Sequence, residues 1–154
     1  MAIDVPDIPG AEDVVRWFGS WPDFHDAEVV SIMLNRSQGA TVEIHTFEMT
    51  SEVDARGFYV LAKHAIVTFT LEGFPLNQEG IATTRIDYFN QQNVLSTAAV
   101  EKTAGGYKLV LEGCFGVEGV IGGEKLSVKI RPGIPSDGIY ADTSPPSRGS
   151  PKAK

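Results

Sequence analysis

The chain has 154 residues, of which 42% are hydrophobic and 21% charged, and its formal net charge is −7. This length predicts a single domain with a core of its own, and the composition excludes a wholly disordered chain. The acidic charge opposes a phosphate backbone, so we expect no nucleic-acid partner. Because no apolar run approaches the roughly 20 residues of a membrane helix, we also expect no membrane partner.

Two features predict a cytoplasmic location. Residues 1–10 have neither the basic nor the apolar region of a secretory signal. Cys114 is the single cysteine, which excludes a disulfide within the chain and fits a reducing compartment. Its neighbours Gly113 and Phe115 favour a small buried filler over a catalytic nucleophile, which would need a histidine base beside it.

A short helix is predicted over residues 11–18. Its apolar residues recur at the spacing of one helical face, namely Ala11, Val14, Val15 and Phe18. Pro9 precedes this segment and Gly19 follows it, and these residues are typical start and stop signals.

The stretch from Trp21 to Val30 reads WPDFHDAEVV and crowds aromatic and ionisable side chains together. Pro22 prevents the helix from continuing, so an irregular lead-in is expected before a strand over residues 27–35. Strand alternation places Val30, Ile32 and Leu34 on one face. Asp26 and Glu28 extend the same row, and we expect them at its end, near solvent.

The next segments predict a hairpin. Residues 36–39 form a turn, and residues 41–49 read as the returning strand. The apolar residues change face within that strand, which predicts a bulge near His45–Thr46. Residues 50–57 are polar and read as a loop, whereas residues 58–72 are the longest strand-forming run.

The second half of the chain predicts further short strands. They cover residues 82–89, with Ile86 and Tyr88 pointing inward, residues 94–102 and residues 107–112. A glycine-rich run at 113–123 indicates bulges or tight turns. The clearest alternation lies at residues 125–131, with three inward-pointing side chains: Leu126, Val128 and Ile130.

This spacing of strands and turns predicts a mainly β fold, an antiparallel sandwich or open barrel of about 7–8 strands with one short N-terminal helix. We expect one domain over residues 1–140. Residues 141–154 are rich in proline and serine and almost devoid of apolar side chains, so we expect a disordered tail.

Histidines and carboxylates raise the question of a metal site. A converging set of His25, Asp26, His45 and His64 would resemble zinc or iron ligation. However, no spacing typical of a metal motif is present, and scattered histidines on a small sheet are the simpler interpretation. The main reading is therefore that the chain has no cofactor and no catalytic residue.

An acid–base pair of His25 and Asp26 is a further possibility. Adjacent side chains in an extended segment point to opposite faces, so the two are expected to diverge. Bracing of the backbone by Asp23 or Asp26 is the preferred alternative. The motif residues then have a structural role: Trp21, Phe24, His25, Asp26 and Glu28.

The nine residues WPDFHDAEV, Trp21 to Val29, resemble a hallmark of the immunity protein 50 family of bacterial polymorphic toxin systems. Later segments are similar too: AIVTF at residues 65–69, NQQNV at residues 90–94 and LSV at residues 126–128. The resemblance covers about residues 17–131.

The resemblance implies a cytoplasmic, non-catalytic protein that binds and neutralises a cognate toxin domain. The acidic charge is compatible with a basic toxin, because complementary charge speeds association. Two rivals stay open: a metal-binding or metal-dependent enzyme that uses His25, Asp26, His45 and His64, and a structural or oligomerising β domain. The residues that contact a partner are not predicted.

Overall fold

The computed structural model describes residues 3–74 and 81–137. For residues 81–83 it describes the backbone alone. It contains one helix and eight strands: α1 (Ala11–Phe18), β1 (Glu28–Asn35), β2 (Gly39–Val53), β3 (Tyr59–Glu72), β4 (Ile81–Arg85), β5 (Val94–Thr103), β6 (Gly106–Phe115), β7 (Glu118–Gly123) and β8 (Lys125–Pro132).

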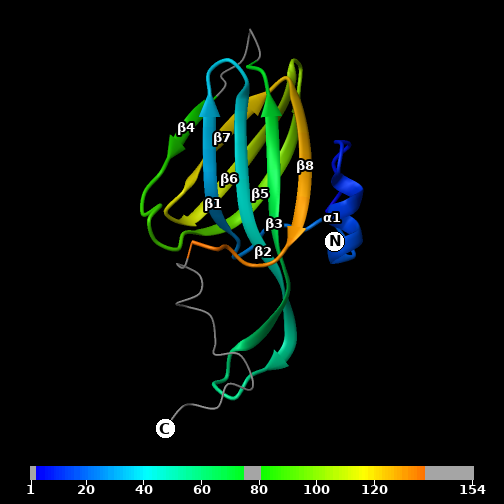
Figure 1. Cartoon of the computed structure of the whole chain (residues 1–154), viewed down its shortest axis with the longest axis vertical. Coiled ribbons are helices and arrows are strands. Elements are labelled where there is room, and N and C mark those ends of the chain that lie inside the picture. Colours follow the sequence, from blue (N-terminus) through cyan, green and yellow to red (C-terminus); the bar gives the residue numbers. More distant parts are fainter. Residues whose placement is uncertain (1–2, 75–80, 138–154) are drawn as a thin grey trace.

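The strands form two four-stranded antiparallel sheets, with orders β1-β2-β3-β8 and β4-β7-β6-β5. Figure 1 shows the first sheet in front of the second, with α1 beside β8. The prediction of a mainly β antiparallel fold with one short helix is confirmed. The predicted tail at residues 141–154 lies outside the described residues.

Helix α1 has the predicted bounds and the predicted buried face. Ala11 and Val14 are buried, and Val15 and Phe18 pack against the core. Gly19 ends the helix in the left-handed conformation, with its N–H bonded to the Val15 carbonyl. No helix in the described part of the chain is long and apolar enough to cross a membrane.

The core lies between the inner faces of the two sheets. The first sheet contributes rows of paired residues that are almost fully buried, such as Val42 beside Phe69, and Phe69 beside Val128. Leu109 and Ile121 form a matching pair in the second sheet. The predicted inward row of β8 is confirmed, because Leu126 and Val128 are buried and Ile130 packs against the core. Burial of one such aliphatic side chain contributes about 1.5–3 kcal/mol.

A bulge in β1 changes the predicted facing of that strand. Val29 pairs with Ile44 and Ser31 pairs with Glu43, so Val30 is an extra residue without an opposite partner. Val29 is buried in the core and Ile32 packs against it. The prediction that Glu28 lies in the same row as Ile32 is therefore wrong, because the bulge reverses the alternation between them.

Strands β2 and β3 continue beyond the sandwich as a two-stranded extension, residues 47–64, which we call the arm (Figure 1). The bulge predicted near His45–Thr46 is misplaced: the register shifts between Thr46 and Glu48, and the extra residue belongs to β3 rather than to β2. The predicted loop at residues 50–57 is wrong in its first half, since β2 runs on to Val53 before the chain turns.

The predicted strand at residues 82–89 is shorter than expected. Strand β4 ends at Arg85, and a turn follows in which the Gln91 N–H bonds the Tyr88 carbonyl. Ile86 and Tyr88 are exposed rather than inward, because they lie after the last sheet pairing of this segment.

Candidate functional site

The WPDFHDAEV motif forms a joint at one end of the sandwich, and its aromatic side chains anchor it in the core. Trp21 and Phe24 are both buried. Their rings and that of Phe69 form a triangle of edge-to-face contacts, with centroids 5.7–6.3 Å apart. Such pairs add about 0.5–1.5 kcal/mol each to the area that they bury.

The backbone of the joint is turned rather than extended. Phe24 and Asp26 have φ angles of 63° and 61°, in the left-handed region. The Asp23 carboxylate accepts the His25 N–H at 2.8 Å, which is the backbone bracing predicted for Asp23. The predicted divergence of His25 and Asp26 is wrong, because this turn brings His25 Nε2 within 3.7 Å of Asp26 Oδ1.

The joint also connects the two sheets. The Asp26 N–H bonds the Leu95 carbonyl, and the Leu95 N–H bonds the Ala27 carbonyl. The buried Asn93 side chain accepts the Val29 N–H and donates to the Val29 carbonyl, both at 2.8 Å. Asn93 thereby satisfies the backbone beside the β1 bulge, and it holds β1 against the start of β5.

A chain of side-chain hydrogen bonds leads from the joint to the root of the arm. Glu28 Oε1 lies 2.9 Å from His45 Nδ1, and His45 Nε2 lies 3.1 Å from His64 Nδ1. Glu28 is only 6% exposed and His45 is fully buried. The expectation that Glu28 lies near solvent is wrong, because Glu28 pairs with His45 on β2, on the face opposite the core residue Val29.

When both histidines are neutral, the sequence of hydrogen bonds from Glu28 to His64 determines which ring nitrogen of each histidine carries the proton. Because the Glu28 carboxylate accepts, His45 Nδ1 carries the proton, and Nε2 of a neutral His45 accepts the Nδ1 proton of His64. Partial burial lowers the pKa of His64 below its usual value of 6.5, and the neighbouring His45 lowers this pKa further. Both effects favour a neutral His64.

The four residues considered as metal ligands, His25, Asp26, His45 and His64, do not converge in one place. His45 and His64 meet on neighbouring strands, whereas the His25 ring bonds the Ser96 carbonyl of the second sheet. Among residues 3–74 and 81–137, no group of three or more histidine, cysteine, aspartate or glutamate side chains is arranged to hold a metal ion. The Glu28–His45–His64 chain is a hydrogen-bond relay in which both nitrogens of the central ring are engaged.

The arm leaves the sandwich at a second bulge. Phe47 of β2 lies opposite two residues of β3, Lys63 and His64, and Lys63 has a left-handed φ of 52°. Both of their carbonyls have donors from elsewhere in the chain: Trp17 Nε1 bonds Lys63 O at 2.9 Å, and the Gly133 N–H bonds His64 O at 2.8 Å. The root of the arm is therefore held by α1 and by the segment after β8.

Beyond this root the arm exposes large apolar side chains. Four of them are more than half exposed: Met49, Val53, Phe58 and Tyr59. Met49 pairs with Leu61 and Val53 pairs with Tyr59. Tyr59 and Leu61 are two positions apart in β3, so their side chains lie on the same face of the arm. Their partners in β2, Val53 and Met49, lie on that face too.

The tip of the arm is ordered by Asp54. Its carboxylate accepts the N–H groups of Arg56 and Phe58, at 2.8 and 3.1 Å. The hydrogen bond from Phe58 is the main cause that lowers the pKa of Asp54. The Arg56 guanidinium lies 5.4 Å from the centre of the Phe58 ring, so the tip presents an aromatic ring that has a cation over it.

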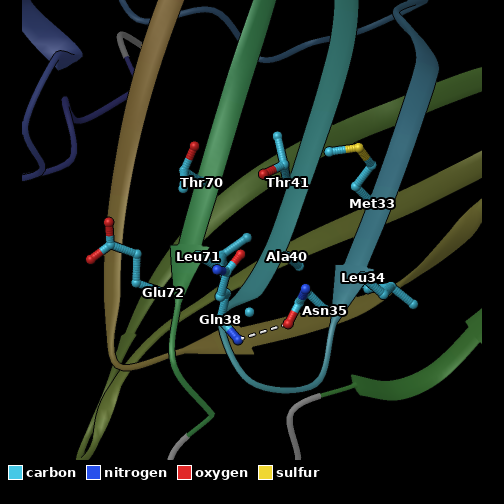
Figure 2. Close-up of a pocket in the computed structure, with 10 residues that line it drawn as sticks. Met33, Leu34, Asn35, Gln38, Ala40, Thr41, Thr70, Leu71 and Glu72 are labelled. Atoms are coloured by element: carbon cyan, nitrogen blue, oxygen red, sulfur yellow. Dashed lines mark hydrogen bonds between the residues drawn. The ribbon is translucent and has the colours of Figure 1, made fainter.

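A hollow of about 630 Å³ opens on the outer face of the first sheet, beside the β1–β2 turn. Figure 2 shows Met33, Thr41 and Thr70 side by side across its floor. Glu72 is the single ionisable side chain among the described residues that line it. Cys114 lies elsewhere and is exposed, contrary to the buried filler that we predicted.

Comparison with protein-family models, with curated proteins and with solved structures finds no match to this chain. The functional argument therefore rests on the joint, the relay and the arm. The sequence singled out the joint and the three members of the relay, but it missed the arm. The alternation of Val53, Tyr59 and Leu61 was the available signal for it.

Proposed function

We propose that this protein is a non-catalytic immunity protein that acts in the cytoplasm by binding a toxin domain and neutralising it. The likeness of Trp21–Val29 to the hallmark of an immunity family supports this proposal. The observation that carries it is the arm, a projecting hairpin that presents an apolar face to solvent (Figure 1).

An exposed apolar hairpin contributes little to the stability of the fold, and a role in binding would explain its presence. An isolated two-stranded hairpin is at best marginally stable in water. This one is nevertheless held at its root by hydrogen bonds from Trp17 and Gly133, and at its tip by Asp54. Clustered exposed apolar side chains are typical of protein contact sites, and tyrosine is favoured among the residues that dominate binding energy. The neighbouring Phe58 and Tyr59 are the expected anchors.

The net charge of −7 favours a basic partner. Opposite charge on a toxin domain would raise the association rate, and like charge would suppress wrong partners. This preference predicts that the complex weakens as the salt concentration rises.

The proposal is tested by co-expression with the toxin domain encoded beside the gene. The chain should restore growth and co-purify with the toxin domain. The double variant Phe58→Ser/Tyr59→Ser should lose both effects. The double variant Tyr88→Ser/Phe115→Ser is the matched control, since it removes a stacked, similarly exposed aromatic pair from the loop after β4 and the end of β6. Persistent toxicity together with no detectable complex would refute the function.

Pairing with a second copy of the chain is the second candidate, and the unaccompanied strands of the arm favour it. Sedimentation of the purified protein distinguishes the two. A stable dimer that Phe58→Ser/Tyr59→Ser dissociates would assign the arm to self-association.

A further inference from the structure

We infer that the arm binds its partner by strand addition: the free edge of β2, at residues 47–50, pairs with an extended segment of the partner that carries lysine or arginine. This inference rests on the proposed function, because it specifies how the same surface recognises a toxin domain. It combines three observations: an open edge, a blocked opposite edge and an uneven distribution of charge.

The edge of β2 becomes open where the arm begins. The pairing of β1 with β2 starts at Glu28 and His45. Past His45, no strand in the described part of the chain lies on that side of β2, whereas β3 continues to pair on the other side. An edge of this kind offers N–H and C=O groups to an incoming strand. Because the Glu52 N–H already bonds Thr50 Oγ1, the open segment ends near Thr50.

The opposite edge of the arm is obstructed at its root. Beyond the pairing of Ala65 with Pro132, β3 also leaves its neighbour β8. However, the carbonyls of Lys63 and His64 are occupied by donors from Trp17 and Gly133. The left-handed conformation of Lys63 also breaks the regular edge that an added strand needs. The two edges of the arm are thus unequal at the root, and β2 offers the regular one until its own register shifts after Met49.

The charges of the arm indicate what kind of strand fits. Its acidic side chains all come from β2 and the residue after it: Glu48, Glu52 and Asp54. Its basic side chains come from the turn and β3: Arg56 and Lys63. Glu48 pairs with Lys63 across the two strands, and Asp54 pairs with Arg56 within the turn at the tip, both within 4 Å. Glu52 lies between these two pairs and is exposed.

This distribution disfavours a second copy on the same edge. Pairing of β2 with the β2 of another copy would bring the glutamates of two acidic edges together, and like charges on adjacent strands are destabilising. A partner strand with lysine or arginine would instead lie beside Glu48, with its end near Glu52, which follows the open segment. Apolar side chains at its alternate positions would cover Met49 and extend the apolar face of the arm.

Hydrogen exchange of the full chain, with and without the co-expressed toxin domain as the probe, tests the pairing directly. Alternate amides of residues 47–50 should exchange rapidly in the free protein and become protected in the complex. A complex that protects β3 amides, or no arm amides, would overturn strand addition and leave the proposed function intact. Absence of any complex would instead refute the proposed function. Protection of residues 47–50 in a dimer of the protein alone would assign the edge to a second copy and overturn the inference.

The charge requirement has its own matched pair of variants. Glu52→Lys should weaken the complex about tenfold at low salt, because it places a cation beside the basic strand. Glu112→Lys makes the same change in net charge on β6, at an exposed position in the second sheet, and should weaken the complex no more than about twofold. Equal effects of the two variants would show that net charge alone matters, and would overturn the role of the β2 edge.

Discussion

The indole Nε1 of Trp17 donates a hydrogen bond of 2.9 Å to the backbone carbonyl of Lys63, which ties α1 to the root of the arm. Lys63 is held in a left-handed conformation at that point, so the bond supports a strained residue. Elements 46 residues apart in the chain thereby cooperate to set the direction in which the arm leaves the sandwich.

Trp17→Phe tests this tie, because phenylalanine keeps an aromatic ring but cannot donate. We expect a loss of about 0.5–1.5 kcal/mol in the free energy of unfolding, the usual net contribution of one hydrogen bond. Amide exchange should increase at residues 60–64 and stay unchanged in the second sheet. Faster exchange throughout both sheets would show that Trp17 supports the core rather than the arm.

Asn93→Ala should be among the most destabilising polar substitutions. It removes both hydrogen bonds from the backbone of Val29, in a place where Asn93 is only 2% exposed. Each buried group that is left unsatisfied costs about 1–3 kcal/mol, so we expect a total of about 2–6 kcal/mol by urea denaturation. Asn93→Asp keeps the acceptor for the Val29 N–H but loses the donor, and it serves as the comparison. Equal stability of wild type and Asn93→Ala would contradict the clamp.

Glu28→Ala removes the acceptor of the buried His45 Nδ1 proton. The expected loss is about 1–3 kcal/mol in the free energy of unfolding. Glu28→Gln retains an oxygen that can accept this proton and should recover part of the loss. If the two variants are equally destabilised, the negative charge of Glu28 matters and the hydrogen bond alone does not suffice.

The lowered pKa of His64 makes stability depend on pH. The unfolded chain has a histidine pKa near 6.5 and binds a proton there, whereas the folded chain resists protonation until its lower pKa is reached. Between these two values the unfolded state binds more protons, so the free energy of unfolding falls as the pH is lowered from 6.5. His64→Gln should flatten this part of a stability–pH curve. An unchanged slope would assign the dependence to other groups.

Much of the sandwich was predictable, because its strands bury one face and therefore alternate. Lys125–Arg131 is the clearest case, with its three apolar residues at every second position. The helix was predictable for the same reason, at the helical period. In both elements the spacing of the apolar residues follows from the contact of one face with the core.

The arm could not be predicted in this way, since no core lies against it. Residues 50–57 contain serine, acidic residues and glycine, which are typical of loops, and an unsupported hairpin shows weak alternation. The relay was hidden by geometry. Its members are 17 and 19 residues apart, and the β1 bulge at Val30 reverses the face on which Glu28 was expected. One-residue changes of register are not visible in an alternating pattern.

Strands β2 and β3 each have one part in the sandwich and another part in the arm, and this separation affects which substitutions the protein can accept. The hydrophobic core in the described part of the chain includes no residue from 47–64. If the arm is the contact surface that we propose, substitutions in residues 47–62 should change which partner is bound and leave the core of the sandwich intact. Exchanging residues 47–62 between two proteins with this sandwich should exchange their binding partners. The bulge at Lys63 and His64 would stay in place and attach either arm to the sandwich.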